Sequence, residues 1–94
     1  MKPRAYLLKT DGTETAIEPR NGTDFTFEEL YPIMECDMIE IIRLPDGRIM
    51  LLDEEGNWSD KPTNERATVL AYNALTMGRG IVGHTVVCED SMIR

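Results

Sequence analysis

Three side chains could form a nucleophilic centre: His84, the only histidine, and the two cysteines, Cys36 and Cys88. A thiol is activated as a nucleophile when an imidazole lies within hydrogen-bond reach. On a shared strand, His84 and Cys88 would be about 13 Å apart at about 3.3 Å per residue, so only Cys36 could meet His84. Three soft ligands also fall short of the four usual for structural zinc. The pattern therefore disfavours cysteine catalysis and a zinc site.

Two further motifs match binding sites only in part. Residues Gly78 to Gly83 read G-x-G-x-x-G, but the glycines follow a predicted helix and open a strand, the reverse of a dinucleotide-binding turn. The acidic residues between positions 53 and 60 offer oxygen ligands, yet Gly56 is fourth in the run, where a calcium loop needs glycine sixth. We expect no catalytic residue, no metal and no cofactor.

Turn residues predict two β-hairpins. Asp11-Gly12 is a two-residue hairpin signal, and Pro45-Asp46-Gly47 combines a fixed φ, a self-bonding side chain and a residue that accepts positive φ. The predicted strands are residues 4–9 and 13–18 around the first turn and residues 38–44 and 48–53 around the second.

Capping signals predict two helices. Thr26 followed by Glu29 is a capping box that starts a helix from Phe27 to about Met34, and Thr63 is the expected cap of a helix from residue 64 to about 77. Gly78 would end the second helix, and Ile81 to Cys88 would form the last strand. The sequence therefore predicts one α+β domain over residues 1–94, in the order β-β-α-β-β-α-β, with a mainly antiparallel sheet and two short helices.

Both strands of the second hairpin are apolar on both faces, so the sheet needs cover on two sides. If the two helices cover one face, either loops or a second copy of the chain must cover the other. A homodimer is therefore one of two arrangements that the pattern leaves open.

The charge is concentrated in the middle of the chain. The net charge is −7, and residues 23–65 carry three basic groups against twelve acidic ones. This field disfavours direct nucleic-acid binding and anionic membranes, and it favours a basic protein surface as partner. The chain also has no apolar run long enough for a signal peptide or a membrane span, which predicts a cytoplasmic protein. The expected exposed binding patch is Asp53, Glu54, Glu55 and Trp58.

The combined pattern resembles a known family. Its pieces are residues 41–47, Met50, residues 53–56, then Asn64, Ala67 and Thr68, and finally residues 81–83 with Val86 and Val87. This pattern, spanning residues 38–90, is similar to small uncharacterised domains encoded in phages, plasmids and conjugative elements of bacteria. The resemblance implies an accessory protein of a mobile element and carries no catalytic residue.

Two functions follow as hypotheses. The first is a non-enzymatic, acidic protein-interaction module, of which one version imitates DNA phosphates to block a host enzyme. The alternative is a small-molecule sensor or enzyme that holds an anion or nucleotide near Arg66, Arg79 and His84, where the glycines around Arg79 leave backbone donors accessible.

Overall fold

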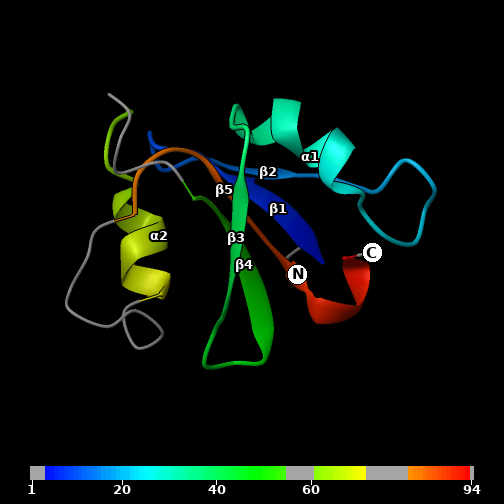
Figure 1. Ribbon diagram of the computed structural model, residues 1–94. Coiled ribbons are helices and arrows are strands. Elements are labelled where there is room, and N and C mark those ends of the chain that lie inside the picture. Colours follow the sequence, from blue (N-terminus) through cyan, green and yellow to red (C-terminus); the bar gives the residue numbers. More distant parts are fainter. Residues whose placement is uncertain (1–3, 55–60, 72–80, 94) are drawn as a thin grey trace.

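A five-stranded antiparallel sheet forms the centre of the protein (Figure 1). The computed structural model describes residues 4–54, 61–71 and 81–93. The strand order across the sheet is β2-β1-β5-β4-β3, so the last strand in the sequence lies in the middle of the sheet. The strands are β1 (Ala5–Leu8), β2 (Glu14–Ala16), β3 (Ile39–Arg43), β4 (Arg48–Asp53) and β5 (Thr85–Glu89).

Both predicted hairpins are confirmed. Gly12 and Gly47 have φ values of 90° and 91°, the left-handed conformation that only glycine adopts without strain. At the second turn, the backbone N–H of Leu44 donates to the carbonyl of Arg48 at 2.8 Å, and Asp46 accepts from the Arg48 N–H at 3.1 Å. The flanking strands pair in register from Ile39 opposite Asp53 to Arg43 opposite Ile49.

The first helix, α1 (Phe27–Met34), begins and ends as predicted. Thr26 accepts from the Glu29 N–H, and the Glu29 carboxylate accepts from the Thr26 N–H, which completes the capping box. The C-cap of the helix is Glu35, whose left-handed φ of 57° is the only positive φ among the described non-glycine residues.

The second helix, α2 (Glu65–Leu70), corrects one prediction, because its cap is Asn64 rather than Thr63. The Asn64 side chain accepts from the Ala67 N–H at 3.1 Å, whereas Thr63 forms an isolated β-bridge with Val82. The expected extension to residue 77 and the stop at Gly78 lie outside the described residues. The last strand is β5, which starts later than predicted, and a short 3-10 helix, η2 (Asp90–Met92), follows it.

The two helices cover opposite faces of the sheet (Figure 1). α1 contributes Leu30 and Met34 to a core that includes Val86 and Cys88, while α2 contributes Ala67 to a second core with Val87. The expectation that both helices share one face is therefore wrong, and the apolar second face that motivated a homodimer has cover within the chain. No helix of the described residues is long and apolar enough to cross a membrane.

Candidate functional site

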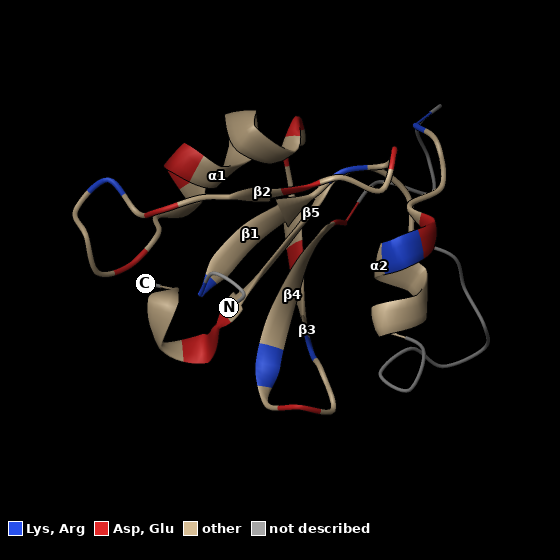
Figure 2. Cartoon of the chain, turned by 180° about the vertical axis from the view of Figure 1, so that it is seen from behind, with Lys and Arg blue, Asp and Glu red and all other residues tan. Residues whose placement is uncertain are grey.

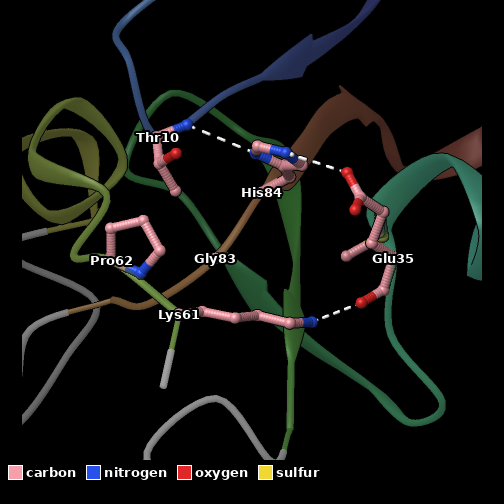
Figure 3. A pocket seen from close by; sticks show the side chains of 7 residues that line it. Thr10, Glu35, Lys61, Pro62, Gly83 and His84 are labelled. Carbon is pink, nitrogen blue, oxygen red and sulfur yellow. Dashed lines mark hydrogen bonds and ion pairs between the residues drawn. The ribbon is translucent and has the colours of Figure 1, made fainter. Parts of the chain in front are cut away.

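A pocket of about 160 Å³ opens where four segments of the chain meet (Figure 3). The segments are the turn after β1, the end of α1, the chain before α2, and the loop before β5. The residues that line the pocket are Thr10, Met34, Glu35, Lys61, Pro62, Gly83 and His84. Because Lys61 and His84 both line it, this pocket is the candidate site for ligand binding or catalysis.

Lys61 is held by acceptors on two sides. Its ammonium group donates to the backbone carbonyl of Glu35 and to Asp53 Oδ2 at 2.7 Å. The Asp53 side chain is only 5% exposed, so this ion pair is well shielded from solvent. Lys61 therefore binds the carbonyl of the C-cap residue of α1, where the helix dipole favours a cation. Two of its three N–H groups are used in this way.

Both nitrogens of His84 are also occupied. The backbone N–H of Thr10 donates to Nδ1 at 3.3 Å, and Nε2 lies 3.2 Å from Glu35 Oε2. Since Nδ1 accepts a hydrogen bond, the imidazole proton is on Nε2, which donates to the Glu35 carboxylate. Neither nitrogen faces the pocket with a free lone pair. The imidazole therefore cannot take a proton from a bound molecule without giving up one of these contacts.

Gly83 lines the pocket and is held in place by the buried Asn64. The Asn64 amide donates to the carbonyls of Leu8 and Gly83, each at 2.9 Å. Gly83 has a φ of 86°, and a Cβ there would lie 3.2 Å from the Cδ of Lys61. Any side chain at position 83 would therefore require the Lys61 stem to shift by a few tenths of an ångström.

The two cysteines are buried and poorly suited to nucleophilic chemistry. Burial raises the pKa of the Cys88 thiol to about 11, and burial followed by the charge of Asp53 raises the pKa of the Cys36 thiol. Both thiols belong to the core beneath α1. A protonated, buried thiol is a weak nucleophile and a poor metal ligand.

Two residues of the predicted anion site, Arg66 and His84, lie in the described part of the chain. Arg66 donates to the Gly12 carbonyl at 2.8 Å and forms an ion pair with Glu14. His84 contacts Glu35, so a carboxylate stands beside each of these two groups. Arg79 lies outside the described residues.

Two residues of the predicted acidic patch, Asp53 and Glu54, are described. Glu54 is exposed as expected, but the Asp53 carboxylate is buried against Lys61 and is not part of an exposed surface. Glu55 and Trp58 lie outside the described residues.

Most basic groups are neutralised within the chain. The described residues carry seven Lys and Arg side chains against fifteen Asp and Glu, and six of the seven basic groups form ion pairs, leaving only Lys9. Five exposed carboxylates have no ion pair or side-chain hydrogen bond within the described part of the chain: Glu18, Glu28, Asp37, Glu54 and Glu65. Figure 2 shows acidic residues on α1 and in the segment that follows it.

Three exposed carboxylates gather at the open end of the β3–β4 hairpin, and we call Glu35, Asp37 and Glu54 the acidic rim. Glu54 is held beside this segment because its N–H donates to the Met38 carbonyl at 3.0 Å. The Glu35 side chain is 69% exposed. Sequence reasoning missed Glu35 and Asp37, although both lie in the acidic middle of the chain directly after the predicted end of α1. No group of three or more candidate metal-ligating side chains occurs among residues 4–54, 61–71 and 81–93.

These features define a small α+β domain, with an antiparallel sheet between two helices and a polar pocket at one end. Residues 1–92 match the family described as Domain of unknown function (DUF3846), and the chain belongs to this family. The match includes the first 37 residues, which the sequence resemblance did not cover. No curated protein and no solved structure matches the chain significantly.

Proposed function

We propose that this protein is a non-enzymatic interaction module that binds a basic surface of a partner protein through the acidic rim. The observation that supports this most directly is the distribution of ion pairs. Nearly all described basic groups are paired within the chain. In the rim, Asp37 and Glu54 have no ion pair with the described residues, and Glu35, which accepts from His84, is still 69% exposed. An uncompensated field of this kind attracts a cationic surface and speeds its association.

The geometry of the pocket favours this function over the alternative of an anion or nucleotide sensor. An anionic ligand would need cations without a carboxylate partner, but among the described residues Lys61 in the pocket pairs with Asp53, and Arg66 outside it pairs with Glu14. A general base would need a free imidazole nitrogen, but both nitrogens of His84 are used. The polar groups of the pocket hold the four segments together, and that structural role accounts for them.

The C-terminus of α1 adds negative charge to the acidic rim. The last turn of this helix contains no basic residue, and the partial negative charge of its C-terminus adds to the charge of Glu35. Lys61 offsets part of this field, but its ammonium is directed inward to Asp53 and the Glu35 carbonyl. The exposed side of the rim therefore remains acidic.

We further propose that the protein acts in the cytoplasm as an accessory protein of a mobile element. The sequence resemblance to domains of phages, plasmids and conjugative elements supports this role. Neighbouring genes provide the test, because members of an accessory family should recur beside integrases, relaxases or phage structural genes. If family members lie consistently within chromosomal metabolic operons, the mobile-element role is wrong.

Affinity capture from a host lysate at low salt tests the binding role. The rim variant combines Glu35→Gln, Asp37→Asn and Glu54→Gln. The matched control combines Glu18→Gln, Glu28→Gln and Glu65→Gln, which changes the charge by the same amount at other exposed sites. We expect the wild type and the control to retain a basic protein that the rim variant loses, and that 0.5 M salt releases. Equal capture by all three proteins, or capture of acidic proteins only, would contradict the proposal.

A further inference from the structure

Strand β3 lies at one edge of the sheet and has backbone groups available for pairing. The Met38 carbonyl accepts from the Glu54 N–H, and the Leu44 N–H donates to the Arg48 carbonyl. The backbone N–H and C=O groups of the even-numbered residues of this segment therefore point toward β4. In an antiparallel ladder the alternate residues point the other way. The N–H and C=O groups of Ile39, Ile41 and Arg43 therefore face outward, and none of the described residues forms a backbone hydrogen bond with them.

The β3 edge also carries apolar surface. Ile41 is 42% exposed and Met38 is 47% exposed, two of the three large exposed hydrophobic side chains in the described residues. The opposite edge of the sheet is β2, which has only three residues, all exposed. Short edge strands resist pairing, whereas a longer strand with exposed apolar residues invites it. The β3 edge is therefore the one suited to strand addition.

We propose that a second copy of this chain pairs with β3, antiparallel and about a two-fold axis at Ile41. Ile41 of one copy then lies opposite Ile41 of the other. Ile39 of each copy lies opposite Arg43 of the other. All three outward residues take part, and each opposed pair exchanges two hydrogen bonds. The two Ile41 side chains meet on the same face, which removes apolar surface from water.

The charge pattern of the edge is complementary to itself. Asp37 precedes the strand and the cationic Arg43 stands at its end, two odd-numbered positions on the same side of the chain, whereas Glu40 points to the opposite face. Antiparallel pairing brings Arg43 of each copy to the acidic end of the other strand. The present partner of Arg43 is Asp90 at 3.5 Å, and both side chains are largely exposed, so this ion pair is weak and easily exchanged.

The alternative registers are less favourable. An axis at Glu40 places the two Glu40 carboxylates directly opposite each other, which is destabilising. An axis at Ile42 places Ile39 opposite Pro45, which has no N–H to donate. The Ile41 register uses every outward group without opposing like charges directly. Because each copy carries a net charge of −7, added salt should strengthen the dimer by screening repulsion.

Disulfide trapping tests both the dimer and its register. Ile41→Cys places two thiols at the axis, where the Cα atoms of a hydrogen-bonded pair are about 5.5 Å apart, within the range that a disulfide spans. Met38→Cys is the matched control on the same edge, because it leaves Arg43 in place and the register separates its two copies by about six residues, or about 20 Å. The native cysteines do not interfere, since both are buried.

Under mild oxidation we expect most of the Ile41→Cys protein to become a covalent dimer and the Met38→Cys protein to form no covalent dimer. Sedimentation of the wild type should show a mass that doubles with rising concentration at 0.5 M NaCl. In this assay Ile41→Lys should stay monomeric and Val69→Lys, at the exposed position on α2, should behave as wild type.

A monomeric wild type at 0.5 mM in 0.5 M NaCl would overturn the proposal. Equal trapping of both cysteine variants would overturn the register. Neither result affects binding through the acidic rim.

Discussion

The side-chain amide of Asn64 lies 2.9 Å from the carbonyl oxygen of Gly83, and this contact joins the start of α2 to the loop before β5. The same amide reaches the carbonyl of Leu8 at the end of β1, and its oxygen caps the helix at Ala67. Asn64 is fully buried. One side chain thus connects three segments that are far apart in the sequence.

Replacing Asn64 with Asp should strongly destabilise the fold. The carboxylate keeps the cap to Ala67 but loses both donors and directs a buried charge at the carbonyls of Leu8 and Gly83. Each buried group left unsatisfied costs about 1–3 kcal/mol, and more when charged, so we expect a loss of about 3 kcal/mol or more by urea unfolding. Thr26→Ala, which removes an ordinary helix cap, should lose about 1 kcal/mol. Similar losses in the two variants would show that Asn64 is only a cap.

Replacing Thr85 with Val should stabilise the protein. The Thr85 hydroxyl is fully buried and has no hydrogen-bond partner among the residues that the structure describes. Valine keeps the shape and removes the unsatisfied polar group, which should add about 1 kcal/mol to the free energy of unfolding. Thr85→Ser serves as the comparison, because it retains the hydroxyl and loses a methyl group, and it should lower the melting temperature. A valine variant less stable than wild type would mean that the hydroxyl has a partner after all.

The elements that the sequence predicted are those encoded locally. Asp11-Gly12, Pro45-Asp46-Gly47 and the Thr26–Glu29 capping box each act within a few residues, and all three formed as expected. The sequence predicts Thr63 as the cap of α2, one residue before the observed cap Asn64, because both residue types are good caps in isolation. Only the contacts of Asn64 with Leu8 and Gly83 decide between them, and these join residues far apart in the chain.

The placement of the helices and the pocket could not be predicted for the same reason. The apolar strands showed that both faces of the sheet need cover, but not which helix covers which face. The contacts of His84 with Glu35 and Thr10, and of Lys61 with Asp53, depend on the strand order. That order places the last strand between the first and the fourth, and no local pattern reports it.

Replacing Gly83 with Ala should cost more than the same change at Gly47. Both glycines have a φ close to 90°, so each alanine pays the same backbone strain of about 1–2 kcal/mol. Nothing lies within 4 Å of a Cβ at Gly47, whereas a Cβ at Gly83 meets Lys61 Cδ at 3.2 Å. Chemical denaturation of the two variants therefore isolates the contact with Lys61. Equal losses would show that the lysine stem moves aside without cost.

Raising the pH from 9 to 11 should destabilise the protein through Cys88. Burial raises the pKa of this thiol from 9.0 to about 11 in the folded state, so the folded chain keeps a proton that the unfolded chain releases. The stability that comes from this protonated thiol is fully present below pH 9 and is lost as the pH rises through 11, and the loss reaches at most roughly 2–3 kcal/mol.

Tyrosine and lysine side chains titrate in the same range, so the difference between wild type and Cys88→Ala is the informative measurement. The variant should be less stable at pH 7 because of the cavity it creates, but its stability should fall less steeply with pH. Parallel curves for the two proteins would contradict a protonated, buried Cys88.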